Sequence, residues 1–252
     1  LILLVGLVFA LAGVLFKLGA TPFHMWIPDV YQGSTTPVTL FVAAAPKVAA
    51  LGIIIRFLML ALPGLQTEMT GLLIAVSIAS MMLGNFVSIV QTNLKRMLAY
   101  SSIAHVGYML LGVIAGSADG YASAIFYVFV LIIMIAGALG VLALMNREGL
   151  SVENISDLQG LNTRSPWLAF IMLMMMFSMA GIPPLVGFFA KLGVLEALIQ
   201  MHFIWLPTLA LVFAIIGAYY YIAVVKVMYF EEPVRNEPVT LGINAHVAII
   251  VN

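Results

Sequence analysis

Four ionisable side chains lie in apolar stretches of the sequence, where each needs a partner, water or a chemical role. They are Lys17, Lys47, His105 and Lys191. Lys47 lies midway along the apolar segment 38–56, so its amine cannot easily reach water at either end. Placing a lysine at the centre of a membrane-spanning helix costs about 2.5 to 3.5 kcal/mol, and such a residue is by default a functional candidate. We therefore treat these four residues as candidate proton-carrying groups.

Pro46 directly precedes Lys47 and changes the surroundings of its amine. A proline inside a helix cannot donate to the carbonyl four residues earlier, here that of Val42, and alanines flank the lysine on both sides. Small neighbours leave room for close helix packing or for a water beside the amine. The alternative is a structural lysine that only binds a free carbonyl.

Lys191 follows a predicted helix break. Pro184, Gly187 and Lys191 are spaced i, i+3 and i+7, which places them on one face of a helix that begins after the break. We expect the amine to point along the opening that the break leaves. Glu196, nearer the aqueous end, either pairs with a basic group there or is a solvated residue of the helix end.

A polar stripe runs along the predicted helix 98–116. Ser101, His105, Tyr108 and Gly112 recur at i, i+4, i+7 and i+11 on an otherwise apolar segment. A hydroxyl, an imidazole and a phenol in line can pass protons through water. For Ser101 and Tyr108 the alternative is a hydrogen-bonding seam between helices. His105 is the preferred candidate because an unperturbed imidazole titrates nearest neutral pH.

Lys17 and His24 flank another predicted break, which contains Pro22. The segments 19–22 and 181–184 each combine glycine with proline, follow an apolar half-span and precede aromatic residues. Paired interruptions of this kind are the best sequence indication of a transport site at the membrane midplane. The residues expected to break the two helices are Pro22, Gly181, Pro183 and Pro184.

The composition requires lipid as the surrounding solvent. Of the 252 residues 64% are hydrophobic and 8% are charged, against roughly 25% charged in an ordinary soluble domain. A net charge of zero argues against nucleic acid as a partner. The absence of cysteine excludes iron–sulfur clusters and thiolate metal sites, and four scattered histidines do not suggest haem or zinc. We predict an all-α polytopic membrane protein with no metal or cofactor of its own.

At about 20 residues per crossing, the apolar pattern predicts about seven spans and the beginning of another from about residue 243. The span 167–200 is too long for one straight crossing, so we expect a broken helix there. The chain begins and stops inside apolar runs. We therefore expect one transmembrane domain over residues 1–252, cut from a longer polypeptide whose N-terminal helices are missing. The predicted spans are about 1–18, 38–60, 70–90, 98–116, 122–145, 167–200 and 204–229.

The distribution of basic residues predicts the orientation. Six of them flank or occupy connections on one side of the membrane, whereas the opposite connections after residues 61, 115 and 199 carry no Lys or Arg. The positive-inside rule places the basic side in the cytoplasm or its equivalent. The six residues are Lys95, Arg96, Arg147, Arg164, Lys226 and Arg235.

The buried amines suggest a relay. Low dielectric disfavours the charged form of an amine, so a buried lysine can take up a proton when a negative charge approaches and release it afterwards. No acidic residue lies at mid-membrane, since Asp29, Glu68, Asp119 and Glu196 all fall near span ends. We expect the counter-charge to come from other helices or another subunit.

Five motifs together resemble one family. The sequence is similar to the antiporter-like subunit N (subunit 2) family of proton-translocating NADH:quinone oxidoreductase, respiratory complex I, and resembles its C-terminal half. Sister subunits and multisubunit sodium/proton antiporters share the broken helices, so a subunit of such an antiporter is the alternative. The motifs are PFHMWIPDVYQG at 22–33, PVT at 37–39 with PKVA at 46–49, QTNLKRMLAYSSIAHVGY at 91–108, AGIPP at 180–184 and GFFAK at 187–191.

The resemblance implies an antiporter-like helix bundle with two discontinuous transmembrane helices. It implies that Lys17, Lys47 and Lys191 belong to a central hydrophilic axis with His105 beside it, and that a glutamate partner of Lys17 lies on a helix preceding this chain. His24, Ser101, Tyr108 and Glu196 are expected auxiliary residues.

The same resemblance implies a non-redox subunit of a translocase. NADH, FMN, iron–sulfur clusters and quinone would then be bound elsewhere in the complex. The implied partners are other membrane subunits and the lipid bilayer. The implied location is a bacterial cytoplasmic membrane, with a mitochondrial or plastid membrane as the alternative. A purely structural membrane scaffold is the remaining hypothesis.

Overall fold

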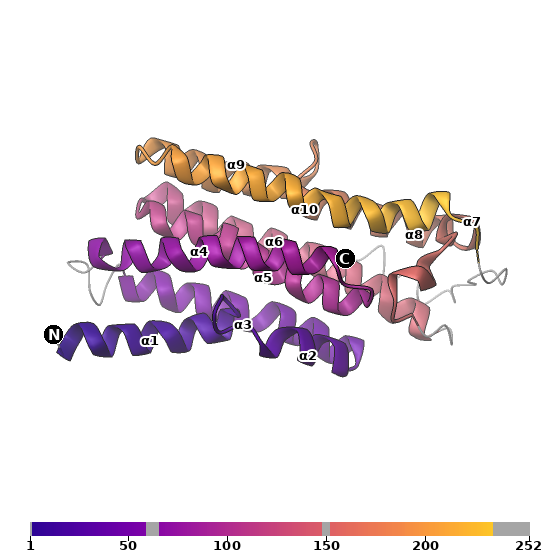
Figure 1. The fold of residues 1–252 in the computed structure, drawn as a ribbon, viewed down its shortest axis with the longest axis horizontal. Helices are drawn as coiled ribbons and strands as arrows, with labels where there is room; N and C mark the ends of the chain where they lie inside the picture. The colour runs from indigo at the N-terminus through magenta and orange to yellow at the C-terminus, as the bar shows by residue number, and fades with distance from the viewer. Residues whose placement is uncertain (1, 59–65, 148–151, 234–252) are drawn as a thin grey trace.

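The computed structural model describes residues 2–58, 66–147 and 152–233, and in these ranges the chain is a bundle of helices without a named strand (Figure 1). The longer helices run roughly along one direction, as a membrane-spanning bundle requires. The helices are α1 (Ile2–Leu18), α2 (Trp26–Gly33), α3 (Thr36–Arg56), α4 (Gln66–Ile89), α5 (Leu94–Ala115), α6 (Ala118–Arg147), the 3₁₀ helix η3 (Ile155–Leu158), α7 (Leu161–Arg164), α8 (Pro166–Ala180), α9 (Val186–Gln200) and α10 (Trp205–Phe230).

The predicted all-α membrane fold is confirmed. Five helices in the described part of the chain are long and apolar enough to cross a membrane: α3, α4, α5, α6 and α10. The predicted broken span 167–200 is divided into α8 and α9, and the first predicted span continues after a break into the short α2. The further span expected from about residue 243 lies outside the described residues.

Both breaks begin at a glycine with a left-handed backbone. Gly19 has φ 74° and Gly181 has φ 86°, a region that side chains with a Cβ rarely adopt. At the second break, the N–H groups of Gly181 and Ile182 both donate to the carbonyl of Phe177 at 3.0 Å. A carbonyl in the last turn of α8 is therefore bonded by the residues that follow the helix. At the first break, the indole of Trp26 donates to the carbonyl of Phe16 at 3.0 Å. Glycine therefore ends each half-helix within the bundle.

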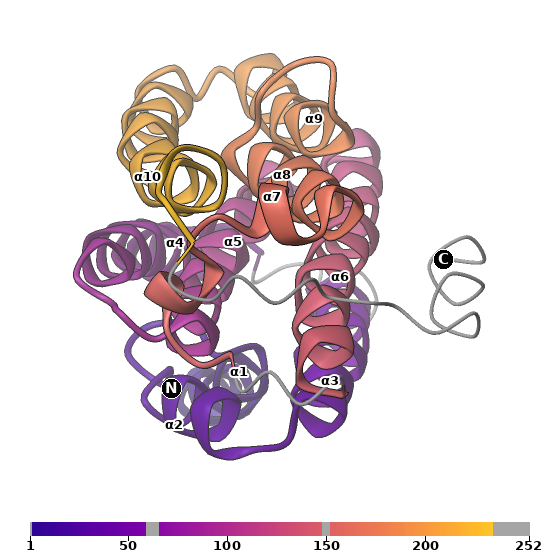
Figure 2. The same cartoon turned by 90° about the vertical axis from the view of Figure 1, so that its right-hand side faces the viewer.

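Helix α5 is the central element of the bundle. Nearly all of its residues are buried, and α4, α6, α9 and α2 pack around it (Figure 2). Close packing depends on glycines: a Cβ at Gly84 or Gly107 would clash with backbone atoms across the α4–α5 contact, and a Cβ at Gly112 would clash with the carbonyl of Gly120 on α6. Small residues thus let backbones approach closely where lipid gives no hydrophobic driving force.

The helix directions agree with the predicted grouping of basic residues. The start of α5, the end of α6, the short α7 and the end of α10 lie at the same end of the bundle (Figure 1). Lys95, Arg96, Arg164 and Lys226 belong to these segments. Arg235 lies outside the described residues.

A glycine-to-alanine change at the second break tests the packing of α8 against α9. A Cβ at Gly187 would overlap the carbonyl oxygen of Ser178, whose hydroxyl also accepts from the Gly187 N–H at 3.1 Å. We expect Gly187→Ala to destabilise the protein by about 1 to 3 kcal/mol, because the backbone of one helix must move. The measurement is the thermal unfolding midpoint of the purified full-length protein in detergent.

The matched control is Gly140→Ala in α6, where a Cβ would meet no atom within 4 Å in the described chain. Alanine is the better helix former, so this change is expected to be neutral or slightly stabilising. Equal unfolding midpoints for the two variants would contradict the proposed packing.

Candidate functional site

Lys47 is buried in α3 and its amine binds two oxygens. Its exposed fraction is 2%, and Nζ lies 3.1 Å from the hydroxyl of Tyr31 on α2 and 3.1 Å from the carbonyl of Ala43. The carbonyl contact corresponds to the structural alternative, although it comes from Ala43 and not from Val42. The phenol contact adds a group that can both donate and accept a proton. Lys47 therefore lies on the interior side of α3, beside the helix that follows the first break.

His105 lies in the middle of α5 between two phenols. Nδ1 is 2.7 Å from the hydroxyl of Tyr127 on α6, and Nε2 is 3.0 Å from the hydroxyl of Tyr221 on α10. The Tyr221 hydroxyl is also hydrogen-bonded to Ser101. In a neutral imidazole one ring nitrogen donates and the other accepts, so exchange of tautomers moves a proton from one side of the ring to the other. The arrangement joins α5, α6 and α10 by exchangeable protons.

Lys191 lies at the second break, where α8 ends. Its Nζ donates to the carbonyls of Met179 at 2.9 Å and Ala180 at 2.8 Å, and it lies 5.2 Å from the ring centre of Tyr108. Carbonyls at the C-terminus of a helix have no partner within the helix and carry partial negative charge, which favours a cation. The face of the Tyr108 ring adds a further attraction. The break thus provides the polar surroundings that a buried lysine needs.

A small cavity lies between Lys191 and His105. The volume of the cavity is about 10 Å³, which is at the lower limit for one water. Polar groups from α4, α5, α9 and α10 face it, as a bound water requires. The lining residues are Asn85, Ala104, His105, Tyr108, Met179, Lys191, Ala214, Gly217, Tyr220 and Tyr221.

Lys47 and His105 belong to two separate hydrogen-bonded groups. Between the described residues, no direct hydrogen bond joins the Lys47–Tyr31 pair to the cluster around His105. The rings of Tyr108 and Tyr127 stack with centres 6.5 Å apart beside this cluster. The site therefore has two hydrogen-bonded parts.

Other predicted residues lie away from this cluster. The Lys17 side chain is exposed at the end of α1 and makes no hydrogen bond to another described residue, and Glu196 is exposed on α9. His24 is half-buried, and its Nδ1 has no hydrogen-bond partner among the described residues. Tyr108 donates to the carbonyl of Ala210 at 3.1 Å, which is the interhelical contact expected of a seam.

The helix-break residues have different positions. Pro22, Pro183 and Pro184 are exposed, whereas Gly181 lies against the side chain of Lys191. A Cβ at Gly181 would be 3.2 Å from the Lys191 Nζ. The glycine therefore has a second role beyond its left-handed backbone, because it leaves space for the amine.

Sequence reasoning did not single out the phenols that complete the site. Tyr31, Tyr127 and Tyr221 bind the candidate lysine and histidine, and Tyr220 donates to Asn85 at 3.2 Å. A usable signal existed, since a buried tyrosine or asparagine in an apolar helix must find a hydrogen-bond partner. Within the described ranges, no group of three His, Asp or Glu side chains comes together as metal ligands would.

Removing one hydroxyl tests the bridge from His105 to α10. Tyr221→Phe leaves the His105 Nε2 and the Ser101 hydroxyl without this partner in a buried site. We expect a loss of about 1 to 2 kcal/mol in unfolding free energy. Thermal unfolding of the full-length protein in detergent measures it. Tyr219→Phe, at a residue 64% exposed on the same helix, is the matched control and should change little. The bridge is absent if the two variants unfold alike.

Comparison with known proteins identifies related chains. Residues 1–217 match the family described as NADH:quinone oxidoreductase/Mrp antiporter, TM. The chain is 58% identical over 253 residues to NADH-quinone oxidoreductase subunit N of Coxiella burnetii and 49% identical over 251 residues to subunit N of Nitrosomonas europaea. Each alignment includes 100% of this chain and 52% of the relative. The chain thus spans about half the length of the curated relatives it matches.

Solved structures share the fold. A chain of respiratory complex I from Thermus thermophilus with bound aureothin matches with a TM-score of 0.81 and 33% identity, over 96% of this chain and 53% of that chain. A chain of the Mrp complex from Dietzia sp. DQ12-45-1b matches with a TM-score of 0.82 and 24% identity, over 88% and 41% of the two chains. The second likeness shows the fold alone.

These findings agree with the membrane character of the helices. The chain is a multi-pass protein of a bacterial cytoplasmic membrane, as predicted. Through the match over residues 1–217, the chain belongs to the NADH:quinone oxidoreductase/Mrp antiporter family of transmembrane proteins, and the relatives it resembles include bacterial subunits N.

Proposed function

We propose that the chain is the proton-conducting part of a membrane subunit of NADH:quinone oxidoreductase, and that Lys47, His105 and Lys191 carry the protons. The relationship to subunits N supports membership of the complex, and the buried polar site supports proton conduction. The observation that carries the proposal is the cavity that joins Lys191 to the His105 cluster inside an apolar bundle. An inert scaffold has no need to bury an amine and an imidazole beside a cavity.

Lys191 can hold a proton and release it toward the cavity. The ammonium form is stabilised by the two carbonyls at the end of α8 and by the Tyr108 ring. Desolvation opposes that form, so the two effects act in opposite directions. A change in nearby charge then shifts the balance between the protonated and neutral amine.

His105 passes the proton between helices. When Nδ1 and Nε2 exchange donor and acceptor roles, the hydroxyls of Tyr127 and Tyr221 rotate to match. A proton that enters at one ring nitrogen leaves from the other. The phenols therefore act as neutral relays whose hydroxyls reorient.

Lys47 is the proton-carrying group on the other side of His105 in this proposal. Like charges repel strongly in low dielectric, so a proton on one of these groups opposes a proton on its neighbour. Moving one charge across 100 mV is worth about 2.3 kcal/mol, which is comparable with the cost of charging a buried lysine. The membrane potential is therefore large enough to drive or oppose the complete transfer of a proton across the membrane.

Lys17 fits the proposal as a residue whose partner lies outside the described chain. It is exposed at the end of α1, beside the first break. A lysine at this depth needs a counter-charge. We infer that another segment of the longer protein, or another membrane subunit, supplies a carboxylate to it, and that NADH, flavin, iron–sulfur clusters and quinone bind to other subunits.

The antiporter alternative has one observation in its favour, since the description of the matching family includes Mrp antiporters. The two functions differ in partners. Purification through an affinity tag on the full-length protein should bring down flavin and iron–sulfur subunits if the chain belongs to NADH:quinone oxidoreductase. A complex without redox groups, combined with sodium-dependent proton exchange, would favour the antiporter.

Removing the charge of Lys47 tests the relay. Lys47→Met roughly keeps the volume of the side chain and removes the proton-carrying group. In inverted membrane vesicles we expect NADH-driven proton uptake per assembled complex to fall by about tenfold, equivalent to about 1.4 kcal/mol in the barrier. Assembly of the complex should persist.

The matched control is Lys226→Met. Lys226 is exposed near the end of α10, so loss of its charge should leave proton uptake unchanged. Unchanged pumping in Lys47→Met would show that Lys47 is structural and would refute the proposed relay.

A further inference from the structure

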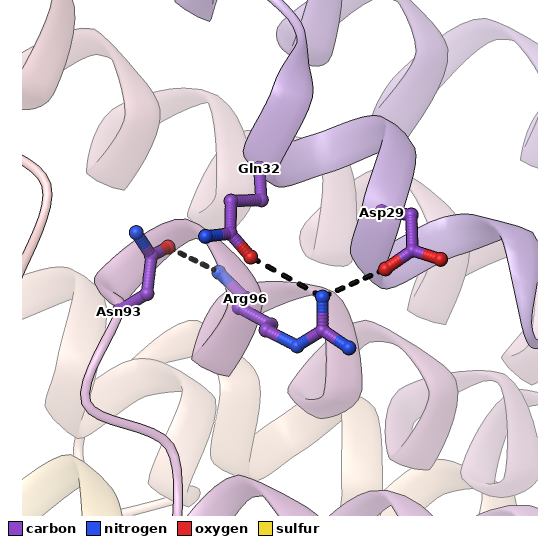
Figure 3. A network of polar contacts seen from close by, with 4 residues as sticks. All are labelled: Asp29, Gln32, Asn93 and Arg96. Carbon is purple, nitrogen blue, oxygen red and sulfur yellow. Dashed lines mark hydrogen bonds and ion pairs between the residues drawn. The ribbon is translucent and has the colours of Figure 1, made fainter.

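A polar cluster at the end of the bundle joins α2 to the start of α5. Figure 3 shows the side chains of Asp29 and Gln32 on α2 turned toward Arg96. The Arg96 Nη1 lies 2.7 Å from the Asp29 carboxylate and 3.2 Å from the amide oxygen of Gln32. The Asn93 side chain accepts from the Arg96 backbone N–H at 3.0 Å and caps α5. The guanidinium therefore extends from a capped and firmly placed turn.

The residue before Arg96 makes a second contact with the same helix. Lys95 Nζ donates to the carbonyl of Ser34 at 2.9 Å, directly after the end of α2. A basic group at this position also interacts favourably with the C-terminal end of the helix dipole. Two consecutive basic residues thus hold α2 at its side and at its end.

Helix α2 needs such contacts because it is too short to be stable without packing against its neighbours. It has 8 residues, and no side chain caps its N-terminus. Helices of this length are not stable in isolation and depend on tertiary packing. The Asp29–Arg96 ion pair is largely exposed, with 74% and 32% of the side chains accessible. Exposed pairs add little to overall stability, so its main effect is to fix where α2 lies.

The position of α2 determines a contact of the proposed relay. Tyr31 lies between Asp29 and Gln32 in the sequence, and its hydroxyl accepts from the Lys47 amine at 3.1 Å. The Tyr31 carbonyl accepts from the Thr39 hydroxyl at 3.3 Å, which links the same residue to α3. A shift of the short helix relative to α5 therefore moves the phenol relative to the amine.

We propose that Asp29 and Arg96 are positioning residues that hold the Tyr31 hydroxyl on the Lys47 amine. The inference rests on the proposed role of Lys47 in proton transfer. According to this proposal, the exposed Asp29–Arg96 ion pair at the end of the bundle affects the buried amine of Lys47. The connection is mechanical: Arg96 fixes Asp29, and the turn of α2 that carries Asp29 also carries Tyr31.

The test uses the full-length protein in its assembled complex. In Asp29→Asn and in Arg96→Gln we expect NADH-driven proton uptake per assembled complex to fall by about two- to fivefold, the range that corresponds to an exposed ion pair. Arg96→Lys keeps a charge within reach of Asp29 and should recover most of the uptake. Lys226→Gln, a loss of an exposed charge at the same end of the bundle, is the control and should have no effect.

A double-variant experiment separates positioning from a general structural role. If the ion pair acts through the Tyr31 hydroxyl, Asp29→Asn should have no further effect on uptake in a Tyr31→Phe background. An equal fold reduction in both backgrounds would overturn the proposal, as would unchanged uptake in Asp29→Asn. If assembly falls, the charge-exchanged variant Asp29→Arg with Arg96→Asp should restore assembly and uptake together. Restored assembly without restored uptake would also overturn it.

The failure of this proposal can be distinguished from the failure of the relay itself. Unchanged uptake in Lys47→Met refutes the proposed function. A normal loss in Lys47→Met together with unchanged uptake in Asp29→Asn refutes only the positioning role.

Discussion

The structure depends on a single constraint: an amine inside an apolar bundle must be surrounded by oxygen atoms. Along a continuous helix each carbonyl already accepts one hydrogen bond within the helix and has only its second lone pair to offer. The break after α8 frees the carbonyls of Met179 and Ala180, and Lys191 binds both. At Lys47 the same need is met by the Ala43 carbonyl and the Tyr31 phenol. The helix breaks therefore supply oxygen atoms that the buried lysines need.

The central position of α5 follows from the same requirement. Its polar side chains can be enclosed on all sides only because neighbouring helices approach closely at Gly84, Gly107 and Gly112. The enclosed side chains of α5 lie in a region of low dielectric, where each hydrogen bond and each charge acts more strongly. Close packing around His105 thus strengthens the contacts on which the proposed relay depends.

The two breaks have similar backbones, but the lysines beside them have different surroundings. Each begins at a left-handed glycine and contains proline. The second break surrounds Lys191 with groups of this chain, whereas Lys17 at the first break is exposed. The short helix α2 after the first break is held by Arg96 and Lys95 at the start of α5, whereas α9 after the second break is long enough to pack along α6. The two half-helices therefore differ in the neighbours that they contact.

The sequence alone determined the class of fold, both breaks and the likeness to its family. These features depend on local properties: apolar length, the missing donor of proline and the free backbone of glycine. The participation of Lys47, His105 and Lys191 in one relay remains a proposal. Only the tertiary structure showed that Tyr31, Tyr127 and Tyr221 contact these side chains, and that Lys17 and Glu196 face outward. The physical reason is that partners on different helices are chosen by the rotation and packing of whole elements, which no spacing along the chain specifies.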